Sequence, residues 1–517
     1  MNIKRAKQEI KNSIAAYLQK DEFGEYLIPT ARQRPLLLMG APGIGKTQIM
    51  EQIAGECDLA LVSYTITHHT RQSAIGLPFI REKSYGGERH SVTEYTMSEI
   101  IASVYDRMEA SGKREGILFI DEINCVSETL APAMLQFLQC KSFGNQKVPQ
   151  GWVIVAAGNP PEYNKSVREF DVVTLDRVKV IPVEPDFEIW KEYAYQAGIH
   201  SSVISYLDIH RENFYRMETT VDGKRFVTAR GWEDLSEMIF AYERMGLKMD
   251  REVIMQYLQH PGTAKDFANY LELYYKYRTD YQVDEILDGM IRPGTLNKLK
   301  FAPFDERIKV VGLLLARLSE NFRKMRELDE YTGTLFEILR RFHGRLDHPA
   351  CAGMSADAVL RELREKEERD VQRRIDAGQN EKELHRRYRG VFRTLCQYEE
   401  LLSRMTEKDS DAAFELVRQQ FAGESDRLEA AEQRAQDQLE YAFDFMESAF
   451  GESQEMAVFI TELSINSGAV WFLKEHECAR YYKYNKELLF DTQQAQIGRQ
   501  LDEIRNRMTG QGSASGI

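Results

Sequence analysis

Short, uninterrupted runs of apolar residues mark the first third of the chain, at 36–39, 117–120 and 152–157, with a weaker run at 59–64. A strand that is covered on both faces has no polar side, so such runs predict the buried strands of a parallel sheet. Helix-like segments connect the runs. The pattern therefore predicts an α/β core in which a parallel sheet is flanked by helices.

The pattern changes after the core. Helix-like segments extend from Asp186 to about Tyr275, and beyond a break at 292–294 apolar residues recur at alternating spacings of three and four. Such seams predict long amphipathic or coiled-coil helices, which more often pack within the chain than dock a partner. The clearest seams are Ile308, Val311, Leu315, Leu318, Phe322 and Met325, and then Leu428, Ala431, Ala435, Leu439 and Ala442.

Residues 40–47 follow the first apolar run and precede a helix-like segment, and they fit the pattern G-x-x-x-x-G-K-[ST] in full. Glycines let backbone N–H groups approach phosphate oxygens closely, and the helix that follows adds a favourable dipole. Lys46 then reaches the β- and γ-phosphates of ATP, and Thr47 binds Mg²⁺. We expect the nucleotide to be held by Gly40, Ala41, Pro42, Gly43, Ile44, Gly45, Lys46, Thr47 and Gln48.

Polar side chains follow two further predicted strands. Asp121 and Glu122 come at the end of the run 117–120, and Asn159 follows the run 152–157. The carboxyl ends of parallel strands meet at one edge of the sheet, so these side chains are expected to join the phosphate loop. Asp121 would support the metal, Glu122 would activate the attacking water, and Asn159 would hold that water or the γ-phosphate.

In kind and order, these motifs resemble those of the AAA+ ATPases, and within them the MoxR-like branch. The resemblance covers about the first half of the chain and rests on residues 40–47, Asp121-Glu122-Ile123-Asn124, Leu135-Gln136, Ala156-Ala157-Gly158-Asn159-Pro160 and Leu175-Asp176-Arg177. It implies that residues 40–47 are Walker A, Asp121 and Glu122 Walker B, and Asn159 sensor 1. It also implies an AAA+ core at 1–185 and a helical lid at 186–285. The apolar seams that follow predict an all-helical, partly coiled-coil-like interaction region at 286–517.

Arginines complete the site that the resemblance implies. Arg177 would be the arginine finger of a neighbouring subunit's site, Arg230 would be sensor 2 in cis, and Arg168 is a second candidate for the trans contact. Charge that builds on a transferred phosphoryl group needs a fixed cation, and the planar donors of arginine supply one. The branch commonly has arginine after the Walker B asparagine, whereas this chain has Cys125.

An arginine finger is useful only across a subunit boundary, so we expect a homo-oligomeric ring, and by family habit a hexamer. The MoxR-like branch typically works with a partner that carries a von Willebrand factor A-type domain, and that partner is implied by similarity alone. The implied activity is ATP hydrolysis, with ATP and Mg²⁺ bound, coupled to the remodelling of a protein client.

Composition limits the classes of partner, of cysteine site and of cellular compartment that we expect. The 517 residues carry a formal net charge of −13, which argues against a broad nucleic-acid footprint without excluding a local basic pore. The six cysteines are widely scattered with no C-x-x-C pair, which indicates reduced thiols and not a disulfide framework or zinc site. No apolar run approaches the length of a membrane span, and the amino-terminal segment lacks a secretory apolar core, so we expect a cytosolic protein.

Two hairpins are predicted within the core. One spans 76–95 around Gly86-Gly87, and the other spans 141–147 before the last core strand. In the MoxR-like branch an inserted hairpin faces the pore of the ring. Phe79, Tyr85 and Phe143 are therefore candidates for gripping a client, although an aromatic residue in a hairpin is more often simple packing. The pair at 68–69, two histidines, has no third ligand at useful spacing and is interpreted as loop.

Two alternative functions stay open. One is a nucleic-acid motor or a restriction or defence-system ATPase of the same clade, which a continuous basic stripe around the pore would favour. The other is a nucleotide-gated scaffold that binds ATP and barely hydrolyses it. The full set of Glu122, Asn159 and the arginines argues against the scaffold, because a pure switch needs fewer of these groups.

Overall fold

The computed structural model describes the chain except for residues 69, 145, 164–166, 168–169, 222, 347, 349–353, 377–380, 406–408 and 489–517. The chain divides into two compact units that interleave along the sequence. The first comprises Met1–Trp190, Phe214–Asp234 and Gly333–Gln420, and the second comprises Lys191–Asn213, Leu235–Thr332 and Phe421–Ile517. The division into domains at 1–185, 186–285 and 286–517 stays a prediction.

A parallel sheet of five strands forms the centre of the first unit, in the order β2-β5-β8-β1-β9. Its central strands are the apolar runs of the sequence, and β5 and β8 are buried along almost their whole length. Parallel pairing places the carboxyl ends of β1, β5 and β8 at one edge, where the polar residues follow. The strands are β1 (Leu36–Gly40), β2 (Ala60–Thr65), β5 (Gly116–Asp121), β8 (Trp152–Gly158) and β9 (Lys179–Val183).

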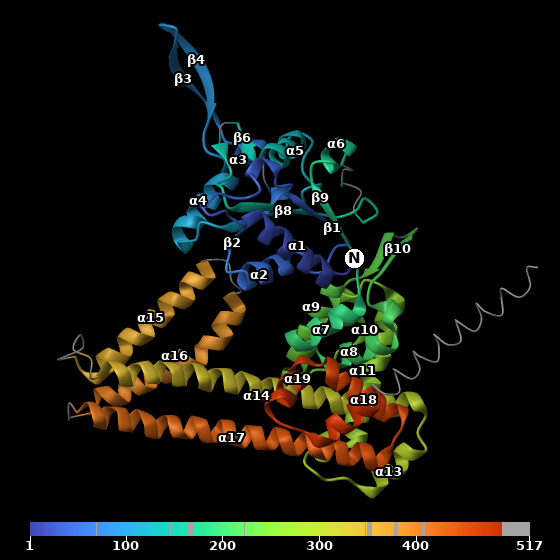
Figure 1. Cartoon of the computed structure of the whole chain (residues 1–517). Helices are drawn as coiled ribbons and strands as arrows, with labels where there is room; N and C mark the ends of the chain where they lie inside the picture. The colour runs from blue at the N-terminus through green and yellow to red at the C-terminus, as the bar shows by residue number, and fades with distance from the viewer. Residues whose placement is uncertain are drawn as a thin grey trace, which may run out of the picture. The chain divides into compact units, whose positions relative to one another are not determined.

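Helices cover both faces of this sheet, which makes three layers (Figure 1). On one face α1 (Ile3–Leu18) and α2 (Lys46–Glu56) pack against alternate strand residues, such as Leu36 and Phe119. On the other face α4 (Glu99–Ser111) and α5 (Ala131–Cys140) pack against the intervening residues. The predicted fold class, a parallel sheet flanked by helices and followed by a long helical region, is confirmed.

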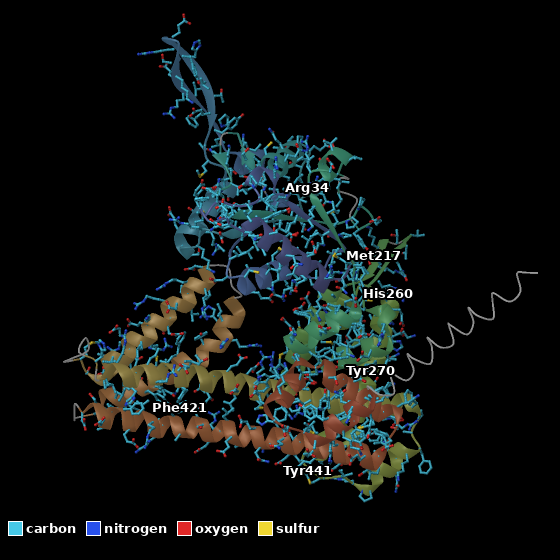
Figure 2. All side chains as sticks on the ribbon, viewed as in Figure 1. Arg34, Met217, His260, Tyr270, Phe421 and Tyr441 are labelled. Atoms are coloured by element: carbon cyan, nitrogen blue, oxygen red, sulfur yellow. The ribbon has the colours of Figure 1, made fainter. Side chains whose placement is uncertain are left out.

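Two predicted hairpins are confirmed in the first unit. Strands β3 (Pro78–Tyr85) and β4 (Glu88–Tyr95) pair around Gly86 and Gly87, and β6 (Ser142–Phe143) pairs with β7 (Gln146–Lys147). Figure 1 shows the β3–β4 ribbon projecting away from the sheet, and Figure 2 shows its side chains standing clear of the core. Ile80 is 78% exposed on it.

One segment that we predicted as part of a helical run is a hairpin instead. Strands β10 (Arg216–Thr220) and β11 (Gly223–Val227) interrupt the helices and pair in antiparallel register. The β-branched residues Thr219 and Thr220 favour a strand, and Gly223 lies at the turn, so the local preference is for a hairpin. The helical pattern on either side concealed this signal.

The remaining helices of the first unit include α15, which packs against α4 and pairs with α16. Helices α7, α9, α14 and α17 each have residues in both units. The bounds are α3 (Arg71–Ile75), α6 (Val172–Leu175), α7 (Phe187–Ala197), α9 (Ala229–Met245), α14 (Phe304–Leu346), α15 (Ala356–Asp376), α16 (Glu381–Ser403) and α17 (Ser410–Ala449).

The second unit is helical. A lysine that is 2% exposed, Lys191, donates to Asp208 at 2.6 Å and to Glu462 at 2.7 Å, and so ties α7, α8 and α18 together. Its further helices are α8 (Ser201–Ile209), α10 (Arg251–Tyr257), α11 (Pro261–Tyr281), α12 (Val283–Leu287), α13 (Pro293–Lys300), α18 (Gln454–Ile465) and α19 (Ser467–Glu475).

Among the described residues, no single helix is both long and apolar enough to cross a membrane. Helices α18 and α19 reach that length and composition only when they are taken together, across a bend of 83°.

Candidate nucleotide site

The predicted phosphate loop connects β1 to α2 at the carboxyl edge of the sheet. Gly43 and Gly45 have φ angles of 73° and 89°, a region that side chains with a Cβ rarely adopt. A Cβ on Gly43 would also lie 3.1 Å from the side chain of Thr228. The two glycines therefore allow the loop to turn and the chain at Thr228 to approach it, while Gln48 lies exposed in the first turn of α2.

Lys46 is the charged centre of the loop. Its side chain is almost completely buried, and its Nζ donates at 2.8 Å to the backbone oxygens of Gly40 and Ala41 and to Oδ1 of Asn159. Burial lowers the pKa of Lys46 to about 8, and the nearby carboxylate of Asp121 opposes that shift. This amine thus connects the phosphate loop to the end of β8. The sequence predicts this meeting, because the two segments follow parallel strands at the same edge of the sheet.

The two carboxylates at the end of β5 have different partners. Thr47 donates from Oγ1 to Oδ2 of Asp121 at 2.8 Å, so the hydroxyl and the carboxylate that were predicted to bind a metal lie side by side. Oδ1 of Asp121 accepts from the backbone N–H of Glu122, which has a φ of 56°. Thr67 holds the Glu122 carboxylate through a hydrogen bond of 3.0 Å, a role that the sequence did not indicate.

Asn159 is held in place by a second asparagine. Nδ2 of Asn124 donates to the backbone oxygen of Asn159 at 2.8 Å, and the backbone N–H of Asn159 donates to Oδ1 of Asn124 at 3.3 Å. Asn124 is buried, and a Cβ on Gly158 would lie 2.7 Å from its Oδ1. The sequence shows Asn124 only as part of a motif, whereas the structure shows that it positions Asn159, the predicted sensor.

Arg230 reaches the same site from the start of α9. Its backbone N–H donates to the oxygen of Gly43 at 3.3 Å, and its charge is one of the causes that lower the pKa of Lys46. Its side chain is exposed. The helix start is fixed locally, because Oγ1 of Thr228 accepts from the N–H of Gly231 at 3.2 Å.

The β10–β11 hairpin joins the phosphate loop to the segment after Asn159. Tyr215, just before β10, donates from its hydroxyl to the oxygen of Pro42 at 3.2 Å, and its ring meets that of Tyr163 edge to face. Lys224 on β11 donates to the backbone oxygens of Glu162 and Tyr163. Burial raises the pKa of the Tyr215 phenol, so it remains a donor at neutral pH.

Other predicted residues lie elsewhere. Arg177 is exposed just beyond α6, and its guanidinium donates to Gln139 of α5; no recorded contact brings it to the phosphate loop within the described part of the chain. Arg168 lies outside the described residues. Phe143 is buried and stacks on Phe137 at 4.3 Å, so it serves packing and not grip.

The described residues contain no cluster of three or more histidine, cysteine or acidic side chains that would hold a metal. His69 lies outside the described residues. The cysteines that the structure describes form no disulfide with one another; they are Cys57, Cys125, Cys140, Cys396 and Cys478.

Comparison with known proteins finds a family match for the region of the parallel sheet. Residues 36–175 match the model of the ATPase family associated with various cellular activities (AAA). No curated protein matches the chain. Among solved structures, a candidate ATPase from Cytophaga hutchinsonii ATCC 33406 is 18% identical with a TM-score of 0.19; the match covers 35% of this chain and 51% of that one, about half of its length.

The buried amine predicts a pH-dependent affinity. Lys46 is charged below its pKa of about 8 and neutral above it, and only the charged form attracts phosphate, so ATP affinity falls as the pH rises. Between pH 7 and pH 9 the charged fraction of Lys46 drops from about nine-tenths to about one-tenth, which predicts a roughly tenfold higher Kd for ATP at pH 9. Isothermal titration calorimetry at the two pH values measures this Kd. A Kd that stays constant over that range would contradict the assignment, and Lys46→Ala should show no such dependence.

The hydroxyl of Tyr215 supplies a second prediction. Tyr215→Phe removes the hydrogen bond to Pro42 and keeps the ring, so the loop loses about 1 kcal/mol of support and ATP should bind roughly fivefold more weakly. Tyr163→Phe is the matched control, since it retains the ring contact with Tyr215. Equal ATP affinity in Tyr215→Phe and the wild type would show that the hairpin does not position the loop.

Proposed function

We propose that the AAA-family ATPase domain at residues 36–175 hydrolyses ATP, and that the chain works as a MoxR-like remodelling ATPase on a protein client. One observation carries this proposal. Contacts of 2.8 Å link Lys46 to Asn159 and Thr47 to Asp121, so the phosphate loop and two strand ends are assembled as one site. These are the groups that phosphoryl transfer to water requires.

The residues present fit a nucleotide with Mg²⁺. The hydroxyl of Thr47 and the carboxylate of Asp121 are oxygen ligands of the kind that Mg²⁺ prefers, and they lie together. The metal would neutralise charge on the phosphates when bound. Lys46 and the backbone N–H groups of the loop hold the phosphates, because they are fixed donors at a helix start.

Hydrolysis needs a base and a group that orients the water. Glu122 is the proposed base; its carboxylate is half-buried and is held by Thr67 next to Asp121. Asn159 is the proposed orienting group, since Asn124 fixes its backbone. Arg230 is the proposed cation in cis, because it lies in the first turn of α9 and its backbone N–H donates to the oxygen of Gly43.

The proposed assembly is a ring, hexameric by resemblance. The exposure of Arg177 supports a role toward a neighbouring subunit, since an arginine finger must be accessible to another copy. Asp171, the residue that caps α6, lies close enough to have its pKa lowered by Arg177, after its hydrogen bonds with Thr174. Arg168 stays an alternative for the same role.

A protein client is favoured by the β3–β4 hairpin. Its apolar side chains Phe79, Ile80 and Tyr85 are exposed, which suits contact with a polypeptide. Between residues 78 and 95 the ribbon carries three lysine or arginine side chains and three carboxylates, so its formal net charge is zero and it attracts a nucleic acid little. The partner with a von Willebrand factor A-type domain and a place in the cytosol are proposed by resemblance and expectation alone.

Mixed rings test the trans role of Arg177. Arg177→Ala and Glu122→Gln should each lower turnover at least about a hundredfold alone. When the two are mixed in equal amounts, each site that pairs an intact Glu122 with a neighbour's intact Arg177 is complete, which random mixing gives at roughly a quarter of sites. Steady-state phosphate release measures the recovery.

Absence of recovery in mixtures that co-assemble would remove Arg177 as the trans residue. Arg34→Ala, which changes an exposed arginine ahead of β1, is the control and should keep wild-type turnover. If neither the wild type nor Arg34→Ala hydrolyses ATP while both bind it, the scaffold alternative would replace the proposal.

A further inference from the structure

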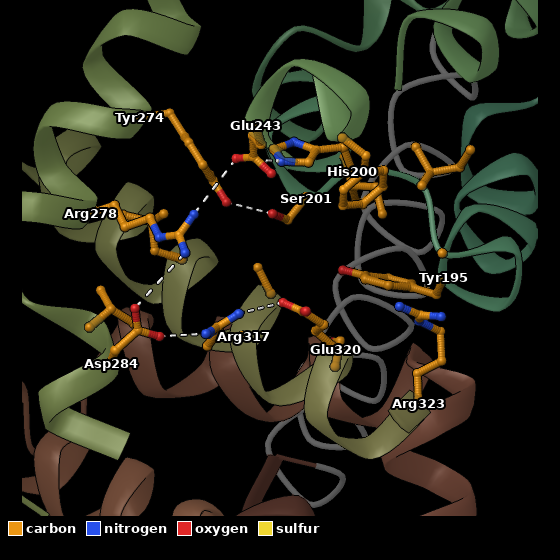
Figure 3. Close-up of a pocket in the computed structure, with 18 of the residues that line it drawn as sticks. Tyr195, His200, Ser201, Glu243, Tyr274, Arg278, Asp284, Arg317, Glu320 and Arg323 are labelled. Carbon is orange, nitrogen blue, oxygen red and sulfur yellow. Dashed lines mark hydrogen bonds and ion pairs between the residues drawn. The ribbon is translucent and has the colours of Figure 1, made fainter. Parts of the chain in front are cut away.

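The second unit contains a cavity of ≈ 360 Å³ that the nucleotide chemistry does not use. It lies among α7, α8, α9, α11, α12 and the first half of α14. Figure 3 shows charged side chains converging on it from several of these helices. Its volume falls within the range of pockets that bind small molecules.

The wall of the cavity combines apolar and charged groups. Ile199, Phe240 and Leu313 are among its apolar lining residues, and four arginines and three carboxylates also line it. The four guanidinium groups outnumber the three carboxylates of the lining by one. The charged residues are Arg244, Arg278, Arg317 and Arg323, and Glu243, Asp284 and Glu320.

The arginines of the cavity differ in how closely they pair with its carboxylates. Arg317 is fully paired, since its Nε lies 2.5 Å from Oδ1 of Asp284 and its Nη1 lies 2.6 Å from Oε2 of Glu320. Arg278 lies 3.7 Å from Glu243 and 3.9 Å from Asp284, which is attraction without a hydrogen bond. Its planar donors therefore remain available to an acceptor in the cavity.

Two further groups are open to a ligand. Oε1 of Glu243 is buried and makes no hydrogen bond of good geometry, although Nε2 of His200 lies 3.4 Å from it and a guanidinium nitrogen of Arg278 lies 3.7 Å from it. Buried polar atoms of this kind usually have a partner, so a donor is expected beside it. Arg323 pairs with Glu327, a residue outside the lining, and leaves its other donors near the cavity wall at Gly198.

We propose that this cavity binds a small phosphate-bearing molecule that also carries hydroxyl groups. The phosphate would accept from Arg278, because guanidinium donors match phosphate oxygens two at a time. Arg323, which lies on the opposite side of the cavity (Figure 3), would donate to a hydroxyl oxygen at the other end of the molecule. A hydroxyl near Arg278 would donate to Glu243, and the apolar residues of the lining would contact the carbon skeleton. The ligand would thereby link α11 to α14, two helices that meet at this cavity.

The competing explanation is a purely structural ion network that braces these helices. In that case the arginines would matter for folding alone, and no molecule would compete with the carboxylates. The proposal does not depend on ATP hydrolysis, so it is tested in the full-length Lys46→Ala chain, where the phosphate loop is disabled. Low salt is used because screening weakens exposed charge interactions.

Calorimetry with glucose 6-phosphate and with citrate distinguishes the possibilities. We expect saturable binding of the sugar phosphate, weakened at least about tenfold by Arg278→Gln and several-fold by Arg323→Gln in the same background. Arg323→Gln keeps the Arg278 and Arg317 pairs, so it tests the site if Arg278→Gln fails to fold. Arg326→Gln, an exposed residue of α14 that pairs with Glu330, is the matched control and should bind like its parent.

Three outcomes would overturn the proposal. They are no saturable binding of glucose 6-phosphate at millimolar concentration, equal binding in a folded Arg278→Gln or Arg323→Gln variant and the control, and binding of citrate alone. The last result would assign the cavity to a polycarboxylate and not to a phosphate.

Discussion

The buried positive charge of Lys46 determines which groups must come together at the nucleotide site. Lys46 is 8% exposed, and its amine donates three hydrogen bonds, each to an oxygen on the loop or at the end of β8. A charge in that position is costly unless donors and acceptors are matched, so the sheet must deliver Gly40 and Asn159 to within hydrogen-bonding distance. The parallel pairing of β1 with β8 does so, because Met39 and Gly158 are register partners.

Further hydrogen bonds hold the groups around the Lys46 amine in place. Asn124 fixes Asn159, Thr67 fixes Glu122, and Tyr215 supports the loop at Pro42. These contacts join segments that are distant in sequence, and they limit how far the loop and strand ends can move apart. The β10–β11 hairpin is central here, since it contacts both the loop and the segment after Asn159, and it leads directly into the helix that carries Arg230.

The sequence predicted four of the five strands of the parallel sheet, because buried strands have a strong, local signal, as the run 117–120 before Asp121 shows. It did not single out the edge strand β9, whose exposed and buried positions alternate. It also predicted which polar residues meet, since parallel strands bring their ends to one edge. It did not predict the roles of Asn124 or Tyr215, because a hydrogen bond between residues 35 or 173 positions apart leaves no local pattern. The arginine-lined cavity was missed for a similar reason: its residues belong to several helices, and each alone looks like a solvated charge.

The most direct test of this account is equilibrium binding of ATP with Mg²⁺ to the wild type and to Lys46→Ala. If the buried amine organises the site, the wild type binds ATP and the variant loses at least about a hundredfold in affinity, since a charge-assisted contact to phosphate and the link to Asn159 are both removed. Equal affinities in two folded proteins would contradict the account at its centre.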